Sequence, residues 1–453
     1  MSEIIISTVK TSKELKSFVR FNYELYKGCP YAVPDLLEDT MDTFNPKKNP
    51  AFNFCEAACF LAKRDGKIVG RIAAIINKRA NDTWNTRNVR FGWIDFIDDI
   101  EVSRLLLETV EQWGKERGMN KVVGPMGFTD MDLEGMLTEG FDQLSTMNSI
   151  YNYPYYNDHM QKLGYTKEVG WVERKVFVPK SGTGHEANKE KYFKVAEIVK
   201  KRYGFRIHKF KNKKEIKEGG YIQKVLHVVN KAYANLYGYS EMDERQMMAY
   251  AEQYLPFLDK RYLSVVETEE GEVIGMGICI TSLSRAIQKA KAKLFPFGWI
   301  HLAKALWFNK KPQILDMLLV GVLPEYQDKG ANALIFADLI PEGSKDGYEW
   351  AETHHQLEDN DKSQTQWKNL DCIIHKKRCA YQKPLPLKQT CITLNHHDGN
   401  KQPKPAADRL SGRQHTPLVR HGTCAYPPRY VYRKTGRRYP SRRRYLCTFE
   451  GSH

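Results

Sequence analysis

The first 180 residues alternate between strand-like and helix-like patterns of hydrophobic and polar positions. Residues 60–77 form two runs rich in β-branched side chains on either side of Asp65-Gly66, which predicts a β-hairpin with a tight turn. Apolar side chains then recur at helical spacing from Val102 to Trp113, so a helix is expected there. A short buried strand, a second helix and a last alternating strand follow, at 121–125, 155–163 and 171–178.

A second segment repeats part of this pattern after a polar, glycine-containing stretch that we interpret as a linker, residues 181–191. Another strand-turn-strand pattern occupies 262–281, and the tetrapeptide Phe-Gly-Trp-Ile of residues 91–94 recurs at 297–300. These matches indicate a duplicated unit. The chain therefore divides into residues 1–180, the linker, residues 192–383 and a tail, residues 384–453.

The second segment continues with a buried strand, a loop, a helix, a strand and a further helix. The strand covers 314–322 and is apolar enough to be buried on both faces, while the helix covers 331–340 and is expected to stop at Pro341. This order predicts an α/β sheet that contains parallel strand pairs.

Composition and charge differ from those of the rest of the chain mainly at the C-terminal end. The whole chain of 453 residues has a formal net charge of +16, but the tail holds fourteen Lys and Arg against three Asp and Glu. It is also rich in proline and poor in aliphatic residues, so we expect disorder. The folded part gives no strong reason to expect a nucleic-acid partner, and only the tail is suited to weak attraction.

Three observations favour a cytoplasmic location. The nine cysteines are odd in number and widely scattered, which does not indicate a disulfide framework. The first residues lack the pattern of a signal peptide, and nowhere do about eighteen apolar residues run together, so no transmembrane segment is expected.

Residues 285–311 form a basic stretch with interleaved aromatic side chains. It lies between the second predicted hairpin and the buried strand, as an insertion would. Packing against the core is one interpretation. An amphipathic lid over a hydrophobic acceptor, or a peripheral contact with a membrane surface, is the alternative.

The candidate chemistry lies in the loop that leads from the buried strand into the next helix. Successive backbone N–H groups there can converge on an anion at the positive end of the helix dipole. Gly330 lets a phosphate approach closely, and Lys329 adds positive charge. The residues expected to bind a pyrophosphate are Gln327, Asp328, Lys329, Gly330, Ala331 and Asn332. An ordinary strand-to-helix turn with one glycine is the alternative.

This loop, within the sequence Val-Leu-Pro-Glu-Tyr-Gln-Asp-Lys-Gly-Ala-Asn, resembles the coenzyme A loop of the GNAT family of N-acetyltransferases. Asn332 stands where the family has Gly or Ala, and Asn also tolerates a helix start. The order of the following elements, with Asn360 and the helix through Trp367, is similar to the family as well. The first segment resembles a degenerate copy, because no pyrophosphate loop follows residues 91–96.

The resemblance implies two GNAT-like α/β domains, each a mixed central sheet flanked by helices. It implies transfer of an acyl group from acetyl-CoA or another acyl-CoA directly to an amine acceptor, whose identity the sequence does not reveal, without a metal. In the family's terms, strand N–H groups around Gly321 and Val322 would hold the thioester carbonyl and the pantetheine. Asn360 would contact coenzyme A.

Direct transfer needs a base for the amine and an acid for the departing thiolate. Asp316 and Glu352 are the candidate bases, and each can equally be a solvated carboxylate at a strand end. Tyr348 is the candidate acid, with Tyr326 as a second choice and packing as the alternative role for both. The adjacent His354 and His355 are not assigned chemistry.

Two functions of other classes remain open from the sequence. The first is a module that keeps the GNAT-like fold without catalysis and binds a partner or peptide. The second is an aminoacyl transferase of a related twin-domain fold, which would depend on charged transfer RNA. Covalent catalysis is disfavoured because no Gly-x-Ser-x-Gly or Cys-His arrangement occurs where a nucleophile is expected.

Overall fold

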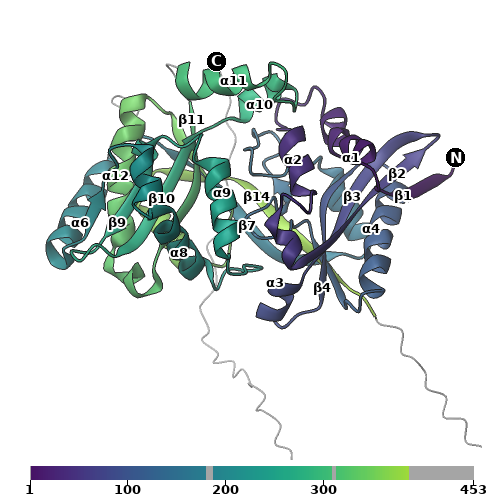
Figure 1. The fold of residues 1–453 in the computed structure, drawn as a ribbon, viewed down its shortest axis with the longest axis horizontal. Coiled ribbons are helices and arrows are strands. Elements are labelled where there is room, and N and C mark those ends of the chain that lie inside the picture. Colours follow the sequence, from purple (N-terminus) through teal and green to yellow (C-terminus); the bar gives the residue numbers. More distant parts are fainter. Residues whose placement is uncertain (1, 180–186, 309–312, 387–453) are drawn as a thin grey trace, which may run out of the picture. The chain divides into compact units, whose positions relative to one another are not determined.

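The computed structural model describes residues 2–179, 187–308 and 313–386 (Figure 1). All of these residues belong to one compact unit, residues 1–389. Apart from its first three residues, the tail predicted to be disordered lies outside the described residues. So do most of the predicted linker and the last residues of the basic, aromatic stretch.

The described strands form one continuous sheet with the order β1-β2-β3-β4-β5-β14-β7-β12-β11-β10-β9-β8, to which β6 and β13 are added at the side. The strands are β1 (Ile4–Thr8), β2 (Cys55–Arg64), β3 (Lys67–Asn77), β4 (Asn88–Phe96), β5 (Lys121–Gly124), β6 (Met136–Glu139), β7 (Thr166–Phe177), β8 (Arg206–His208), β9 (Leu263–Glu267), β10 (Val273–Thr281), β11 (Ile314–Val322), β12 (Trp350–Thr353), β13 (Gln356–Leu357) and β14 (Cys372–Pro384).

Helices flank this sheet. They are α1 (Ser12–Leu25), α2 (Leu37–Thr43), α3 (Lys78–Thr83), α4 (Ile100–Lys115), α5 (Tyr155–Lys162), α6 (Ala187–Tyr203), α7 (Lys213–Glu218), α8 (Tyr221–Tyr233), α9 (Glu244–Tyr254), α10 (Ser284–Ala290), α11 (Trp299–Ala303), α12 (Ala331–Asp346) and α13 (Asp361–Gln366), with short helical turns η1 (Pro50–Asn53), η2 (Lys260–Tyr262), η3 (Lys304–Phe308), η4 (Pro324–Lys329) and η5 (Trp367–Asn369). The predicted fold class, a mixed sheet with parallel pairs and flanking helices, is confirmed.

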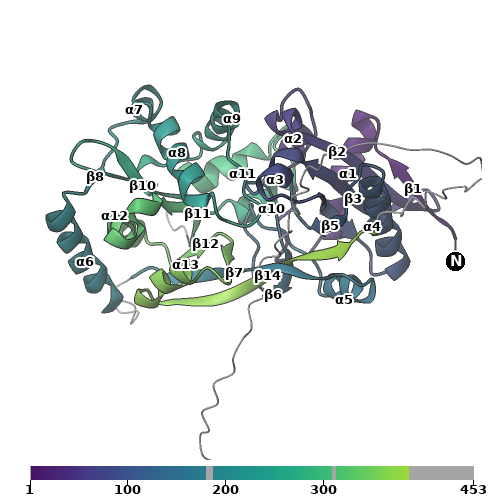
Figure 2. The same ribbon diagram turned by 90° about the horizontal axis from the view of Figure 1, so that it is seen from below.

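The two halves of the sheet exchange a strand at its centre. β7 belongs to the first segment but pairs with β12 of the second, where Trp350 lies opposite Phe177. β14, the last described strand, pairs in turn with β5 of the first segment, where Pro384 lies opposite Lys121. β7 and β14 also pair with each other along most of their length, and Figure 2 shows β14 running from the second segment into the first. Each half of the sheet is therefore completed by a strand from the other segment.

The two predicted hairpins are present as β2-β3 and β9-β10. Asp65 and Gly66 both have positive φ, 49° and 74°, which suits the twist of a two-residue hairpin turn. The Phe-Gly-Trp-Ile match is wrong as a sign of duplication: residues 91–94 lie on β4, whereas residues 297–300 lie at the start of helix α11. β4 instead has its counterpart in β11, because each is the central strand that follows a hairpin.

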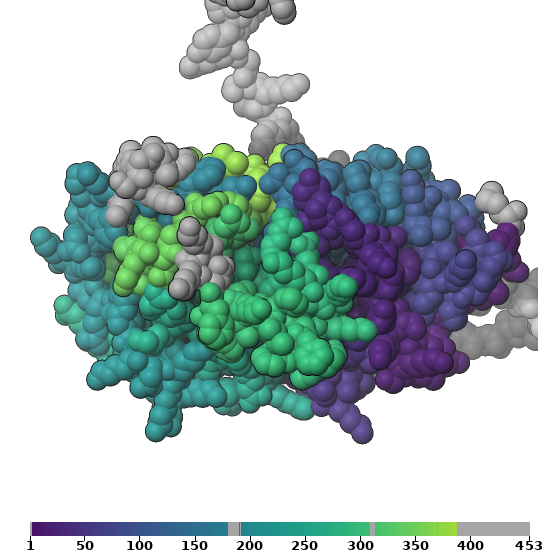
Figure 3. Space-filling view, turned by 90° about the horizontal axis from the view of Figure 1, so that it is seen from above, coloured from purple at the N-terminus to yellow at the C-terminus, as the bar shows by residue number. Residues whose placement is uncertain are grey.

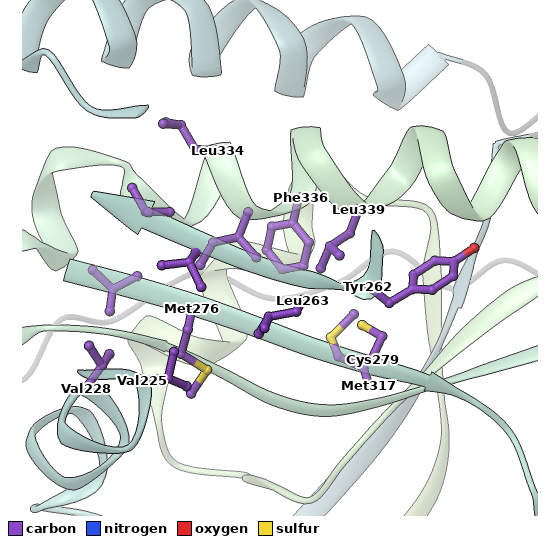
Figure 4. Packing of buried hydrophobic residues seen from close by; sticks show 14 of the residues in the cluster. Val225, Val228, Tyr262, Leu263, Met276, Cys279, Met317, Leu334, Phe336 and Leu339 are labelled. Atoms are coloured by element: carbon purple, nitrogen blue, oxygen red, sulfur yellow. The ribbon is translucent and has the colours of Figure 1, made fainter. Parts of the chain in front are cut away.

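Helix α12 differs from its prediction because it continues through Pro341 to Asp346. It ends at Gly347, whose positive φ of 82° allows the N–H to bond back to Gly343 O. Figure 4 shows Leu334, Phe336 and Leu339 of this helix packed on one face of the sheet, with Val225 and Val228 of α8 on the other. Burial of this apolar face offsets the cost of one proline inside the helix.

A group of fully buried ions lies where β7 and β14 pair, with Lys376 opposite Glu173. Lys376 Nζ lies 3.1 Å from Glu173 Oε2 and also contacts Glu352 on β12, while Arg378 contacts Glu173. Burial alone would raise the pKa of Glu173, but the charges of Arg378 and Lys376 hold that pKa well below its usual range. Because the partners come from both segments, the network couples the two halves.

Replacing Lys376 by Met should therefore destabilise the whole compact unit. Glu173 and Glu352 would stay buried with too little positive charge, at a cost of about 3 kcal/mol or more in the free energy of unfolding. Lys377→Met is the matched control, since Lys377 is 41% exposed and its pair with Glu139 lies at the surface. Urea denaturation of both variants measures the difference. Equal stability of the two variants would contradict the coupling role of the network.

Candidate active site

A cleft of about 1160 Å³ lies on the second half and is walled by both segments. Its lining comes from α8, α9, β10, β11, the end of β12 and the region of α13, together with residues of the first segment that include Asp130, Met131 and Glu134. Most of the lining side chains are aliphatic or aromatic. Many of the polar lining side chains belong to η4, α13 and residues 353–356, and the apolar remainder suits a ligand with a large apolar part.

One edge of β11 opens into this cleft. β12 pairs with β11 only as far as Met317, opposite Thr353, and His354 N then donates to Met317 O at 3.2 Å. Over residues 318–322 the described strands leave β11 paired with β10 alone. Backbone groups on the free edge need other partners. The predicted residues Gly321 and Val322 lie on this stretch and line the cleft.

The loop after β11 is not the open loop that the sequence predicts. Residues 324–329 form the 3₁₀ turn η4, in which backbone groups bond to each other, and Gln327 Nε2 donates to Val322 O at 3.2 Å. The ammonium group of Lys329 lies 4.3 Å from the centre of the Tyr326 ring. The number of amides left free for an anion is therefore smaller than expected.

The free amides lie at the start of α12. Gly330 has a φ of 78° and turns the chain from η4 into the helix. Ala331 and Asn332 are the first two residues of α12, so their N–H groups have no acceptor within the helix itself, and Gly330 offers no side-chain cap. Asn332 lines the cleft, as do Gln327 and Asp328, whereas Lys329, Gly330 and Ala331 are not part of the lining.

Asn360 also lines the cleft. Its side-chain oxygen accepts a hydrogen bond of 3.1 Å from Ser363 N, so it caps α13. Lys362 on the same helix lies 3.7 Å from Asp328 and is exposed. α13 and the start of α12 thus border the same end of the cleft.

The three predicted catalytic side chains lie inside the protein and not in the lining of the cleft. Asp316 and Glu352 are opposite each other on β11 and β12. Burial, together with the negative charge of Glu352, raises the pKa of Asp316 to about 8. Glu352 belongs to the Lys376 network, and the Tyr348 hydroxyl is bonded to Thr281. Asp316 and Glu352 lie away from the cleft because the pairing register of β11 and β12 holds both carboxylates next to the central ion network.

Two residues without an assigned chemical role in the sequence analysis, His354 and His355, line the cleft after the end of β12. His355 Nε2 lies 3.2 Å from Ser149 Oγ and 3.4 Å from Glu173. The adjacent His354 is buried, which lowers its pKa to about 3 and keeps the ring neutral. These histidines connect the cleft with the buried ions beneath it.

The sequence analysis also missed two carboxylates, Asp130 and Glu134, which line the cleft from the first segment. They lie in the loop after β5, within the string Thr-Asp-Met-Asp-Leu-Glu of residues 129–134. Three acidic residues at alternate positions directly after a buried strand were the available signal. That signal does not reveal which part of the protein the loop would face.

The equivalent position in the first half is filled by the chain itself. β5 pairs with β4 only over residues 88–90, so β4 has a free edge comparable to that of β11. There Met126 N donates to Phe91 O at 2.8 Å, and a Cβ atom on Gly92 would lie only 2.5 Å from Met126 O. The loop after β5 therefore occupies the space beside β4 and then continues into the cleft of the second half.

No family model matches the sequence. The chain is 28% identical to protein YghO of Escherichia coli K12 over 344 residues, which cover 74% of this chain and 83% of that protein. It is 27% identical over 332 residues to a protein of Caulobacter vibrioides named bacterial ceramide synthase, covering 72% of this chain and 82% of that protein.

Similar solved structures are GNAT acetyltransferases. One is a tandem GNAT protein from the clavulanic acid biosynthesis pathway, with a TM-score of 0.47, 10% identity and coverage of 85% of this chain and 99% of that chain. Another is a GCN5-related N-acetyltransferase from Sphaerobacter thermophilus, with a TM-score of 0.45, 10% identity and coverage of 84% and 96%. These likenesses concern the fold alone.

Two further searches cover only the described residues. None of the described helices has the length and apolar character needed to cross a membrane. Within the same residues, no group of three or more His, Cys, Asp or Glu side chains is arranged to hold a metal ion.

The raised pKa of Asp316 predicts a specific pH dependence of stability. The folded protein keeps the proton of Asp316 up to about pH 8, whereas the unfolded chain releases it near the ordinary value of about 4. The free energy of unfolding should therefore fall between these pH values, and Asp316→Asn should remove this contribution. Relative to wild type, the variant should gain stability from pH 5 to pH 8.5 in thermal denaturation. Asp142→Asn, at an exposed site, controls for the loss of one charge, and parallel wild-type and Asp316→Asn curves would refute the assignment.

Proposed function

We propose that the protein is an acyltransferase that moves an acyl group from an acyl-CoA directly to an amine in the cleft. The observation that carries this proposal is the free edge of β11, which opens into the cleft next to the free amides at the start of α12. A thioester with a long polar arm and a diphosphate needs this combination: backbone groups for the arm and unpaired N–H groups for the anion.

In this proposal the diphosphate lies at the N-terminus of α12, beside Asn332. The pantetheine arm follows β11 over residues 318–322 and bonds to the free backbone groups near Gly321 and Val322. Asn360 borders the same end of the cleft, and Gly330, Gln327, Asp328, Lys329 and Ala331 shape the turn that precedes or begins the helix. Acetyl-CoA and longer acyl-CoA thioesters share these contacts.

The reaction would follow direct transfer. The amine nitrogen attacks the thioester carbonyl, the carbon–sulfur bond breaks, and coenzyme A leaves as a thiolate that takes up a proton. The attacking nitrogen must be unprotonated, so a side chain in the cleft has to accept its proton. Asp316, Glu352 and Tyr348 stay candidates only through a chain of other groups, because they do not reach the cleft.

The acceptor is proposed to be an amine attached to a long apolar chain. The lining of the cleft is largely aliphatic and aromatic, which suits such a chain. The name of the Caulobacter relative supports the same class, since a ceramide is the amide of a long-chain amino alcohol. The cytoplasmic location stays a prediction.

Isothermal titration with acetyl-CoA and with palmitoyl-CoA tests the proposal. Wild type should bind at least one of them, and Asn332→Asp should weaken that binding at least tenfold, because the new carboxylate faces the diphosphate. The same substitution leaves the helix intact, since an acidic residue near a helix N-terminus is favourable. Asn53→Asp, on an exposed turn of the first segment, is the control.

Absence of binding to both thioesters would favour the non-catalytic module instead. Equal binding by wild type and Asn332→Asp would refute the diphosphate site. Activity that requires charged transfer RNA would favour the aminoacyl transferase.

A further inference from the structure

Asp130 and Glu134 each have one buried carboxylate oxygen without a hydrogen-bond partner among the described residues. These atoms are Asp130 Oδ1 and Glu134 Oε2, and Glu134 is 7% exposed. Both side chains line the cleft. Buried carboxylate oxygens without partners are costly, so a pair of them in a cleft indicates a missing cationic or hydrogen-bonding ligand.

We propose that Asp130 and Glu134 form the acceptor site, where they bind the ammonium group of a primary amine and remove its proton. The catalytic part of this inference rests on the proposed acyl transfer, whereas the binding of a cation does not. The site belongs to the first segment and serves the cleft of the second.

The positive charge of Arg90 does not satisfy the pair. Arg90 is close enough to lower the pKa of both carboxylates, but its guanidinium donates to the carbonyl oxygens of Gly127, Phe128 and Gly238 at 3.2–3.3 Å. Arg90 therefore fixes the loop and leaves the carboxylates free. A cation from outside would find two acceptors that are already in place.

Tyr233 connects the pair with the free edge of β11. Its hydroxyl donates to Val320 O at 3.2 Å, and burial, together with the charge of Asp130, raises its pKa to about 12. Asp130 consequently lies near the stretch of β11 proposed to hold the thioester. Tyr237 and Tyr250 line the same part of the cleft, and their rings favour a nearby ammonium group.

The protonation of Asp130 and Glu134 suits both the binding of the ammonium group and the removal of its proton. Burial raises the pKa of Asp130 to about 7 and that of Glu134 well above its usual value, with the negative charge of Asp132 adding to both and Arg90 opposing it. Tyr233, Tyr239 and Tyr250 also face this region and stay neutral. Near neutral pH, Asp130 is thus able to accept a proton from an ammonium group.

Acyl transfer to the bound amine begins with proton removal. The ammonium group gives one proton to the Asp130 carboxylate and becomes a neutral amine. Its lone pair forms the bond to the thioester carbon, the electron pair of the carbon–sulfur bond leaves with sulfur, and the second proton on nitrogen passes to the thiolate. The products are the amide, coenzyme A with a free thiol, and a protonated Asp130 that returns its proton to solvent.

Titration with octylamine and with 1-octanol, in the presence and absence of acyl-CoA, tests the acceptor site. Wild type should bind octylamine at least tenfold more tightly than 1-octanol. Asp130→Asn and Glu134→Gln should each weaken octylamine binding at least tenfold and leave 1-octanol and acyl-CoA binding unchanged. Asp359→Asn, an exposed carboxylate in the same cleft, is the control. A circular dichroism melt verifies that each variant is folded.

The outcomes separate this inference from the proposed function. Acyl-CoA binding together with equal affinity of wild type and both variants for octylamine would overturn the acceptor site and leave the acyl transfer in place. Selective octylamine binding without any acyl-CoA binding would overturn the acyl transfer and leave a cation site.

An independent observation concerns the outer surface of residues 284–308, which comprise α10, α11 and η3 (Figure 3). Five large aromatic side chains are 50–73% exposed there: Phe295, Phe297, Trp299, Trp307 and Phe308. This stretch contains five Lys and Arg residues and no Asp or Glu. An exposed apolar group of this size on a surface helix is typical of an interaction site.

The inner side of this segment packs against the rest of the protein, so the exposed aromatic residues are not displaced core residues. Ile287 and Leu302 pack in a buried cluster together with Leu36 and Phe257. Gln288 Nε2 donates to Ala32 O at 2.7 Å, and Leu37 N donates to Ala292 O at 2.9 Å. The expectation of core packing thus holds for the inner face, and the outer face needs another partner.

We infer that this outer face binds the surface of a membrane that contains anionic lipids. Aromatic side chains favour the headgroup region of a bilayer, and the lysine residues match its negative charge. A second protein copy with the same positive face would be repelled. This assignment does not depend on catalysis.

Co-sedimentation with phosphatidylcholine vesicles, with and without 30% phosphatidylglycerol, provides the test. Wild type should bind the anionic vesicles, with at least fivefold weaker binding at 0.5 M salt. The double variant Trp307→Ser and Phe308→Ser should lose at least fivefold in binding, whereas Ile374→Ser, an exposed apolar residue on β14, should bind as wild type does. Failure to bind anionic vesicles would refute the membrane surface, as would self-association that the double variant abolishes.

Discussion

The interaction on which the structure depends is the buried pairing of charges where β7 pairs with β14. Lys376 and Arg378 come from the last described strand, Glu173 comes from the first segment, and Glu352 comes from the second. None of these side chains is tolerable in the interior without the others. The charges therefore require the strand exchange, and the strand exchange joins the two segments in one sheet. In the observed register of β7 and β14, Glu173 and Lys376 lie directly opposite each other.

This arrangement gives the two halves different roles. Each half has a central strand with a free edge, β4 in the first and β11 in the second. In the first half the loop after β5 fills the space beside β4, which removes any room for a ligand there. The same loop then supplies Asp130 and Glu134 to the cleft beside β11. The filled edge of β4 and the two carboxylates in the cleft beside β11 are consequences of one loop conformation.

The sequence predicts those features that arise from neighbouring residues. The hairpin at Asp65-Gly66, the helix α4 and the strand β11 follow from local periodicity and turn chemistry. The strand exchange does not, because pairing of Pro384 with Lys121 depends on contacts between residues distant in the chain. The loop after β11 was recognised by its residues, but its conformation as a 3₁₀ turn reduces the number of free amides to those that follow Gly330.

The candidate site likewise depends on contacts between residues that are distant in the chain. The sequence predicts Asp316 and Glu352 as bases because they lie on strands next to the predicted thioester, and proximity along the strand is all that a sequence offers. Their surroundings are set by Lys376, on a strand that the sequence does not pair with theirs. Asp130 belongs to a segment that looked like an inactive copy, so only the folded chain reveals that it faces the second cleft.

The basic, aromatic segment of residues 284–308 lies close to the cleft. Met147 packs against residues 284–308 and also against the core of the second half, and its neighbour Asn148 lines the cleft. The proposed membrane surface therefore adjoins the wall of the proposed acceptor cleft. An amine on a long apolar chain is poorly soluble in water and concentrates in bilayers. An enzyme that binds the bilayer beside its cleft can take up such an acceptor without exposing the apolar chain to water. This would explain why an exposed aromatic surface lies next to a cleft lined with apolar residues and two carboxylates.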